Sequence, residues 1–567
     1  MKKLAFIFFA IFISAALFAA GGQSGTQAAR TAPGAIPSYI NLDGHLPVVK
    51  PGNNISMTLS WQPNETYANT SDPADIWWFR FVREAMNIDL RVSARGPGAE
   101  VKNLMFASGD LPDIWLYGLT TDDIVQYGVA EKMLLPISDY LTPELMPNLY
   151  KAYQDAPELA SPSTASDGKI YGFPNFRGKD WLHGPITGGL ARVYFQKQWL
   201  DQLNMKVPET LDEYLNVLRG YKSIGSDVLP DAGIFNSNNN FVLLFSALGF
   251  HWTTNYNGII TVGTRNNKVT FVYGDRDIYP KFLETYKTMY DEGLITRDFF
   301  TMDNNARVAL TMSGKGGCIP FNLVTMTGQT HCFNYVSAKP LTSEFNREML
   351  WGAPSNYVVI NLAAITSKNR YPEAACRMFD FGFTPENGVL VYYGYPDTQV
   401  DKMYGMSNGW TIFNNRIDIL RNNNNPPIYE NDGYFGNNRI RPMNDMVGFA
   451  YNFDTVAMRM YGMNPPPEAF NPTNPDSYAR GSTYQNLSPH VKTDFPFVIY
   501  WDEARARRIS DLSSVLNDFA NIQFAQFVTG ARPLSDLNNY FAELDRMGYQ
   551  EYLRYFTEYY AGYKSGK

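Results

Sequence analysis

Aromatic and amide side chains gather at the predicted ends of strands and in the loops that follow them, and their chemistry is that of a binding site. The flat face of an indole or phenol ring packs on apolar C–H groups, and an amide both donates and accepts hydrogen bonds. This combination suits a saccharide, which offers an apolar C–H face and an array of hydroxyls. The candidate ligand-binding residues are Trp61, Asn64, Trp115, Tyr117, Trp181, Asn236, Asn238, Trp252, Asn322, Trp351, Tyr357 and Tyr393.

Each of these residues also has a purely structural interpretation. A tryptophan near a strand end can belong to the hydrophobic core, as we expect for Trp78 and Trp199, which lie in predicted helices at apolar spacing. The asparagines of residues 236–240 can cap a helix or close a turn. Both interpretations stay open from the sequence.

Catalytic and metal-binding patterns are weak in this chain. A glycoside hydrolase needs two carboxylates about 5 Å apart if it is retaining, or about 6.5–9.5 Å apart if it is inverting, and the 55 acidic residues could supply them. The string GMSNG at residues 405–409 has the form of a nucleophile elbow but lacks the flanking strand and helix. The five histidines are scattered, and no CxxC or HExxH motif occurs. We predict no catalytic residue, no metal site and no cofactor.

Residues 106–117, FASGDLPDIWLY, predict the step from a helix through a turn into a buried strand. The helix ends at Gly109, Pro112 prevents re-entry into a helix, and the apolar run from Ile114 begins the strand. We interpret Asp110 and Asp113 as turn and cap residues. Ligands of open α/β sheets lie outside the carboxyl ends of the strands, which places Trp115 and Tyr117 near a ligand.

The elements around this segment predict a parallel sheet. Strands are expected at residues 55–61, 87–93 and 114–117, with helices at 75–86 and up to 109 between them, and this alternation favours crossover connections. Thr210 and Glu213 form a predicted capping box. Residues 167–176 are expected to form a turn, a short strand and a proline-ended loop. Further strands are expected at 192–195 and 354–366, and further helices at 198–203, 241–248, 282–292, 372–379, 510–528 and 533–559, the last interrupted at Gly548.

Length and composition favour a folded protein with more than one core. A chain of 567 residues exceeds the size of a single compact domain, and 45% hydrophobic with 18% charged residues excludes the disordered class. The formal net charge of −7 argues against nucleic acid as a partner. The cysteines leave two interpretations open: Cys318 and Cys332 form a disulfide, or both are buried thiols like Cys376.

The N-terminus predicts export. Lys2 and Lys3 precede an apolar run from Leu4 to Ala20, followed by small residues, which is the layout of a signal peptide. We assign residues 1–22 to the signal peptide and 23–50 to a flexible tether. No cysteine lies at the junction, so the sequence does not support a lipid anchor, and the protein is expected outside the cytoplasm, periplasmic or extracellular, with membrane association left open.

The order of several motifs resembles a known family. ASGDLPDI begins at Ala107, DGKIYGFP at Asp167, YFQKQWLDQLNMKVPETLDEY at Tyr194, YDEGLITRDFF at Tyr290, YPEAACRMFDFGFTPENG at Tyr371, and FVTGARPLSDLNNYFAELDRMGYQEYL at Phe527. Together these motifs resemble the extracellular solute-binding proteins of carbohydrate ABC importers, in the family 1 branch called lipoprotein LplA-like. Many members of this branch carry a lipobox cysteine that the present chain lacks.

The resemblance implies an α/β, two-lobed periplasmic-binding-protein-like fold with a ligand cleft between the lobes. Lobe 1 is expected to hold residues 51–165 and about 351–400, and lobe 2 residues 166–350 and about 401–567. The implied function is capture of a carbohydrate, expected to be an oligosaccharide, and its delivery to ABC permease subunits. The protein is expected to act as a monomer. The alternatives are a secreted glycoside hydrolase and a binder of a peptide-like solute.

Overall fold

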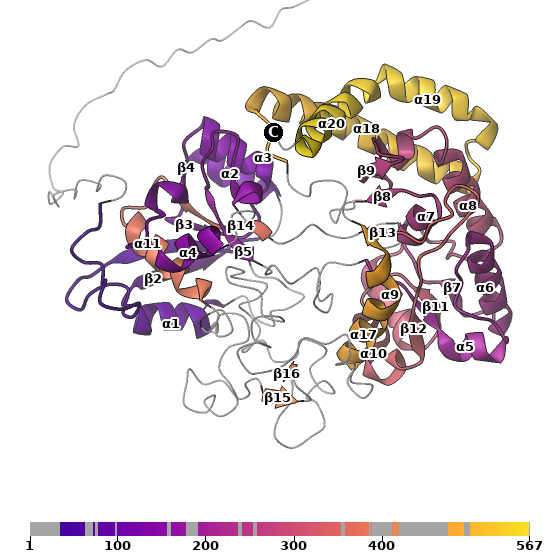
Figure 1. Cartoon of the computed structure of the whole chain (residues 1–567), viewed down its shortest axis with the longest axis horizontal. Coiled ribbons are helices and arrows are strands. Elements are labelled where there is room, and N and C mark those ends of the chain that lie inside the picture. Colours follow the sequence, from indigo (N-terminus) through magenta and orange to yellow (C-terminus); the bar gives the residue numbers. More distant parts are fainter. Residues whose placement is uncertain are drawn as a thin grey trace, which may run out of the picture.

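The protein folds into two α/β lobes. The computed structural model describes residues 35–62, 72–73, 77–96, 99–155, 160–176, 191–235, 241–252, 258–352, 358–384, 387, 411–413, 416–418, 475–492 and 499–565. Figure 1 shows lobe 1, mostly indigo and purple, on the left, and lobe 2, magenta to yellow, on the right. The two-lobed α/β fold class predicted above is confirmed.

Lobe 1 is built on one mixed sheet with the order β2-β1-β3-β14-β4, in which β5 also pairs with β14. β1 is parallel to β2 and to β3, whereas β14 is antiparallel to β3, β4 and β5. The predicted parallel alternation of strand and helix is therefore confirmed for the first three strands. The strands are β1 (Ser56–Trp61), β2 (Asp89–Ala94), β3 (Ile114–Leu116), β4 (Leu134–Leu135), β5 (Gly172–Phe176) and β14 (Val358–Thr366).

Helices cover both faces of this sheet and bury its apolar side chains. Leu59 of β1 and Val82 of α1 lie in one cluster, and Trp115 of β3 and Phe106 of α2 lie in a second. α2 ends before Gly109, whose φ of +70° breaks the helix as predicted. The helices are α1 (Trp77–Ala85), α2 (Ala99–Ser108), α3 (Thr121–Asp123), the π-helix η2 (Ile124–Ala130), α4 (Pro147–Asp155) and α11 (Pro372–Asp380).

Lobe 2 contains a four-stranded sheet and a smaller antiparallel sheet. The first has the order β12-β6-β11-β7, with β6 antiparallel to β11 and β12. The second has the order β10-β9-β8. These strands are β6 (Tyr194–Gln196), β7 (Leu229–Asp231), β8 (His251–Trp252), β9 (Val262–Arg265), β10 (Lys268–Phe271), β11 (Gly316–Ile319) and β12 (Tyr335–Ser337).

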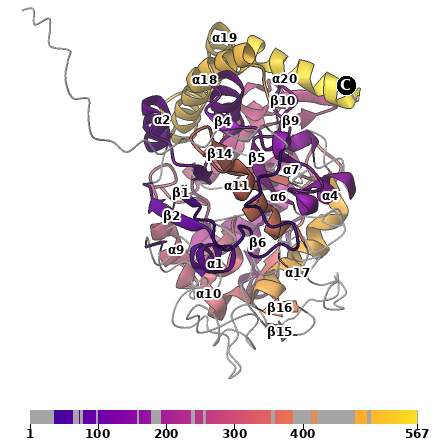
Figure 2. The same cartoon turned by 90° about the vertical axis from the view of Figure 1, so that its left-hand side faces the viewer.

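Helices from distant parts of the chain complete lobe 2. Phe282 of α8 lies 5.8 Å from Phe524 of α18, centre to centre, so the C-terminal helices share the core of the central segment. In Figures 1 and 2, α18, α19 and α20 lie together at one end of the molecule. The helices are α5 (Lys197–Gln202), α6 (Leu211–Ile224), α7 (Val242–Ala247), α8 (Tyr279–Asp291), α9 (Asn304–Met312), α10 (Leu323–Cys332), α17 (Pro475–Leu487), α18 (Glu503–Thr529), α19 (Leu537–Arg546) and α20 (Tyr549–Lys564).

Short elements connect these layers. α19 and α20 are separated at Gly548, whose φ is +100°, so the predicted interruption is confirmed. β13 (Trp351–Gly352) pairs with β17 (Val491–Lys492), and β15 (Thr411–Phe413) pairs with β16 (Arg416–Asp418). The 3-10 turns are η3 (Ile137–Tyr140), η5 (Ser161–Ser163), η7 (Gly258–Ile260), η8 (Val272–Gly274), η9 (Phe381–Phe383), η10 (Ser488–His490) and η11 (Leu534–Asp536).

The structure shifts three of the predicted boundaries. Part of the predicted tether packs on lobe 1, because Ile40, Val48 and Val49 are buried in its core. β5 belongs to the lobe 1 sheet, although lobe 2 was predicted to begin at residue 166. Trp351, predicted to begin the return to lobe 1, packs on Trp252 of lobe 2 with ring centres 5.3 Å apart. The chain therefore crosses between the lobes after Phe176, again before Val358, and a third time between α11 of lobe 1 and α17 of lobe 2.

The three cysteines are free and buried in the structure. Of the two interpretations left open by the sequence, the structure has the buried thiols. Burial raises the pKa of the Cys318 and Cys376 thiols well above the ordinary value, so both stay protonated at neutral pH.

The capping box of α6 is formed as predicted. Thr210 Oγ1 accepts a hydrogen bond from Glu213 N at 3.2 Å, and Glu213 Oε2 accepts one from Thr210 N at 3.2 Å. We expect Thr210→Ala to lower the free energy of unfolding by about 1 kcal/mol in urea titrations, since it leaves helix-terminal N–H groups without a partner. Thr557→Ala, at an exposed site inside α20, is the control and is expected to change it by less than about 0.5 kcal/mol. Equal effects of the two changes would contradict this prediction.

Candidate functional site

The strand register shows which edge of the lobe 1 sheet faces the crossings. β14 runs antiparallel to β3, with Ala363 beside Leu116, so the start of β14 at Val358 lies beyond the carboxyl end of β3. Phe176, the last residue of β5, pairs with Val358 and lies at the same edge. These two connections to lobe 2 therefore leave from the edge at which β1 and β3 end. We call the residues there, Trp61, Gln62, Arg95, Tyr117 and Gly118, the first crossing edge.

The lobe 2 sheet presents an equivalent edge. The chain enters this sheet at the start of β6, and Tyr194 pairs with Ile319 at the end of β11. Asp231, the last residue of β7, pairs with Cys318, so β7 ends at the same edge. Asn322 follows β11 there. The segment that leaves the first crossing edge thus arrives at this second crossing edge, and a ligand bound between the lobes would contact both.

Tyr117 is the predicted site residue that the structure places on the first crossing edge with an exposed ring. Its side chain is 38% exposed, and its φ of +68° is followed by a φ of +87° at Gly118. A Cβ on Gly118 would lie 3.5 Å from Gln62 Oε1 and 3.6 Å from Arg95 Nη2, so an amide and a guanidinium flank this turn. Ring, amide and cation together are groups that bind hydroxyl-rich ligands.

Asn322 is the predicted site residue on the second crossing edge. Its Oδ1 accepts a hydrogen bond from Thr325 N at 3.4 Å and caps α10, and its side chain is partly exposed. Phe321 beside it lies under the Arg307 guanidinium, whose carbon is 5.2 Å from the ring centre. Burial lowers the pKa of Arg307 to about 10, which still leaves it charged at neutral pH. Asn322 therefore has a capping role in this structure, and its amide also reaches the surface.

The remaining described tryptophans of the predicted site lie in the cores. Trp61 packs on Phe79 with ring centres 5.6 Å apart, and Trp115 packs on Phe106 at 5.1 Å. Trp252 and Trp351 pack on each other in lobe 2. All four are at most 4% exposed, so none of them offers an open ring face to a ligand in this structure. Asn64, Trp181, Asn236, Asn238, Tyr357 and Tyr393, and the string at 405–409, lie outside the described residues.

Asp113 has the structural role that was predicted for the turn before β3. Its Oδ2 accepts hydrogen bonds from Thr58 N at 2.7 Å and from Thr58 Oγ1 at 2.9 Å, which joins this turn to β1. Asp113 lies at the amino end of β3, away from the first crossing edge. Its carboxylate holds the start of β3 beside β1.

A buried carboxylate lies at the second crossing edge. Asp231 accepts a hydrogen bond from Tyr214 Oη through Oδ2 and one from Gly233 N at 2.7 Å through Oδ1. Burial raises the pKa of Asp231, and its hydrogen bonds oppose this rise. With both oxygens engaged inside the protein, Asp231 anchors the turn after β7. Within the described ranges, no group of three or more His, Cys, Asp or Glu side chains could hold a metal ion.

Sequence reasoning missed Arg95 and Gln62. Gln62 directly follows the strand predicted at 55–61, and Arg95 lies two residues beyond the strand predicted at 87–93. A polar residue just beyond the carboxyl end of a parallel strand is a signal for the ligand edge, and this signal could have found both residues.

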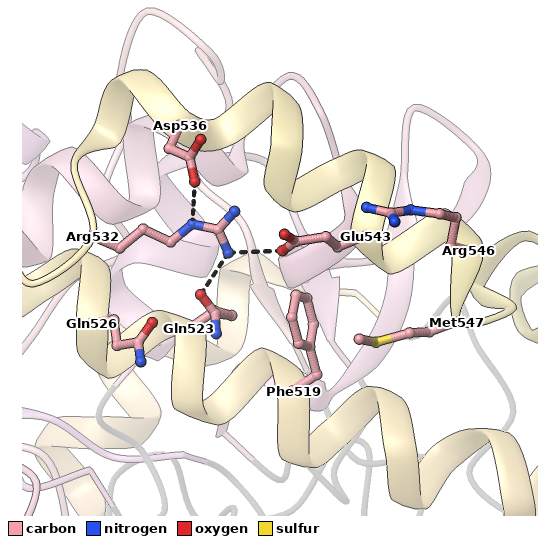
Figure 3. A pocket seen from close by; sticks show the side chains of 8 residues that line it. All are labelled: Phe519, Gln523, Gln526, Arg532, Asp536, Glu543, Arg546 and Met547. Carbon is pink, nitrogen blue, oxygen red and sulfur yellow. Dashed lines mark hydrogen bonds and ion pairs between the residues drawn. The ribbon is translucent and has the colours of Figure 1, made fainter.

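A pocket on the C-terminal helices lies apart from both crossing edges in sequence. Figure 3 shows Arg532 between Asp536, Gln523 and Glu543. Its Nε donates to Asp536 at 2.6 Å, and its Nη1 donates to Gln523 at 2.6 Å and to Glu543 at 2.9 Å. These carboxylates raise the pKa of Arg532, although burial opposes the rise. The polar groups of the pocket are thus engaged with one another and tie α18 to α19.

Comparison with known proteins adds to this geometry. The chain is 23% identical over 483 residues to the fructooligosaccharide ABC transporter substrate-binding protein FusA of Streptococcus pneumoniae, which covers 83% of each chain. It is 26% identical over 223 residues to the polygalacturonan/rhamnogalacturonan-binding protein YtcQ of Bacillus subtilis, covering 39% of this chain and 41% of that protein. No family model matches the chain.

Solved structures share the fold. The structure of FusA of S. pneumoniae in complex with kestose superposes with a TM-score of 0.69 at 20% identity, and covers 91% of this chain and 100% of that one. An HMO-binding solute-binding protein of Bifidobacterium longum infantis gives a TM-score of 0.66 at 17% identity, over 90% and 99% of the chains. The chain is similar in sequence and in fold to solute-binding proteins of ABC transporters. The resemblance noted in the sequence is thereby confirmed.

In the present chain, the central strands of both sheets end at the crossings described above. Within the described residues, no helix has both the length and the apolar character needed to cross a membrane.

Proposed function

We propose that this protein captures an oligosaccharide outside the cytoplasm and delivers it to the permease of an ABC transporter. The observation that carries the proposal is the similarity to FusA over 83% of both chains. The arrangement of the two crossing edges supports the same function, because a ligand held between them makes closure of the lobes depend on binding.

In this proposal the ligand is held by neutral polar groups and a ring. Tyr117 offers an aromatic face, Gln62 an amide from lobe 1, and Asn322 an amide from lobe 2. The other predicted residues that lie outside the described ranges, such as Trp181 and Asn236, remain part of the proposed site. The protein is proposed to act as a monomer, with release of the ligand after the closed form meets the permease.

Binding without catalysis follows from the same observations. FusA and YtcQ are named as binding proteins. Among the described residues at the two edges, the carboxylate of Asp231 is committed to Tyr214 and to a backbone amide. A glycoside hydrolase and a binder of peptide-like solutes remain the alternatives that the experiment below must separate.

Export is also part of the proposal. The basic residues and apolar run at the N-terminus favour a signal peptide. A further relative, 25% identical over 228 residues, is the B. subtilis lipoprotein LipO. We therefore propose that the protein is exported and acts in the periplasm or outside the cell, with or without association with the membrane.

Kestose is expected to stabilise the protein in a thermal-shift measurement. A ligand present at about 100 times its Kd stabilises the folded state by about 2.7 kcal/mol, because it binds the native protein and not the unfolded chain. The screen should include galacturonan oligosaccharides, neutral disaccharides and short peptides. Glycan recovered unchanged after long incubation supports a binding protein, and shortened glycan supports the hydrolase. A shift with peptides alone would contradict the proposal.

A further inference from the structure

Arg95 lies between the ends of two strands of the first crossing edge. It follows β2 directly, and its backbone N–H donates to Trp61 O at 2.8 Å, which places its side chain beside the end of β1. Nη1 donates to Ser60 O at 3.0 Å, and Nη2 donates to Leu116 O at 2.9 Å. A single side chain therefore ties the end of β1 to the end of β3.

The same guanidinium holds the backbone of Tyr117. Arg95 Nη2 donates to Tyr117 O at 2.5 Å, and the indole N–H of Trp115 donates to the same oxygen at 3.0 Å. The guanidinium carbon lies 4.3 Å from the centre of the Trp115 ring, so the two donors are stacked on each other. The carbonyl oxygen of Tyr117 thus accepts hydrogen bonds from the Arg95 and Trp115 side chains, and these two side chains also stack on each other.

Tyr117 needs this support because its backbone is strained. A φ of +68° is unfavourable for a residue that has a Cβ, and such geometry persists where the surroundings over-determine it. The next residue, Gly118, continues in the same region without that penalty. Backbone strain of this kind is common at functional sites, and Tyr117 lies on the first crossing edge.

The charge of Arg95 is not explained by an ion pair. Within the described residues its hydrogen bonds run to carbonyl oxygens and to Ser60 Oγ, and none runs to a carboxylate. Burial lowers the pKa of the guanidinium to about 10, so it remains protonated at neutral pH. Because a partly buried cation without an acidic partner is costly to desolvate, we attribute its contribution to the geometry it imposes.

We propose that Arg95 is the positioning residue of the saccharide site, holding the Tyr117–Gly118 turn in its left-handed geometry so that the Tyr117 ring faces the ligand. The inference rests on the proposed function. A planar guanidinium reaches both strand ends and the Tyr117 carbonyl at once, whereas the ammonium of a lysine is a point donor and cannot.

The test compares Arg95→Lys with Arg91→Met, a change at an exposed arginine of β2 that pairs with Asp89. Two quantities are measured: the Kd for kestose by calorimetry, and the hydrogen exchange of the amides at 116–119. Arg95→Lys is expected to weaken kestose binding about tenfold and to speed exchange at the turn. Arg91→Met is expected to change neither.

A double-mutant cycle separates positioning from direct contact. Since Arg95 acts through Tyr117, Tyr117→Ala should cost much less affinity in the Arg95→Lys background than in the wild type. Full additivity, or wild-type affinity and exchange in folded Arg95→Lys protein, overturns the inference. If wild-type protein binds none of the glycans, the proposed function fails, and the exchange comparison alone decides the role of Arg95: faster exchange supports it and unchanged exchange overturns it.

Discussion

Replacing Trp115 with alanine is expected to lower the free energy of unfolding by about 3–5 kcal/mol. The side chain is fully buried, with its ring against Phe106 at 5.1 Å and under the Arg95 guanidinium at 4.3 Å. The change would leave a cavity in the core of lobe 1 and remove one of the two donors to Tyr117 O. Denaturant titrations followed by circular dichroism would measure the loss.

Tyr117→Ala is the matched variant for this prediction. The Tyr117 ring is partly exposed, so its removal is expected to cost less than about 1 kcal/mol of stability while it weakens saccharide binding. If instead Trp115→Ala keeps wild-type stability and loses binding, then Trp115 is an open ring platform, and our description of the core around it is wrong.

Replacing Lys102 with methionine is expected to lower the free energy of unfolding by about 3 kcal/mol. Lys102 Nζ lies 2.5 Å from Asp123 Oδ2, and the two side chains are 11% and 9% exposed. Methionine leaves the buried carboxylate without its cation, although Thr120 still donates to Asp123 through N at 2.7 Å and through Oγ1 at 2.8 Å. The change would weaken the contact between α2 and Asp123, the last residue of α3.

Lys169→Met is the control for Lys102→Met. Lys169 pairs with Asp139 at 3.0 Å, but the two side chains are 45% and 30% exposed. An exposed ion pair contributes about 0–1 kcal/mol, so this variant is expected to stay close to the wild type in the same titration. Equal losses in the two variants would show that burial of the Lys102 pair has no special effect.

The lobe 1 sheet could be predicted because local signals and tertiary structure agree there. An alternating strand, a helix that stops at Gly109 and an apolar run from Ile114 each specify their own element. The prediction of a flexible tether was wrong in part, because local signals and tertiary structure disagree there. Ile40, Val48 and Val49 are too sparse to form a periodic pattern, and their burial comes from contacts with distant residues. The crossing after Phe176 depends likewise on pairing with Val358, which no local pattern reveals.

The candidate site could be predicted only in part. Strand ends pointed to Tyr117 at the edge of the lobe 1 sheet, whereas Asn322 was a candidate because of its amide, with no strand predicted before it. The strand-end rule could not separate Tyr117 from Trp115 two residues earlier, since burial depends on helix α2 packing over the strand. Arg95 was missed because its importance lies in hydrogen bonds to backbone atoms of Leu116 and Tyr117, which the sequence does not show.

The central claim is that a saccharide binds between the two crossing edges, and the structure of a complex tests it most directly. The glycan with the largest thermal shift should be crystallised with the protein. We predict that the saccharide lies between the lobes, on the Tyr117 ring of lobe 1 and within hydrogen-bond distance of the Asn322 edge of lobe 2. A saccharide bound to one lobe alone, or in the pocket around Arg532, would contradict the account.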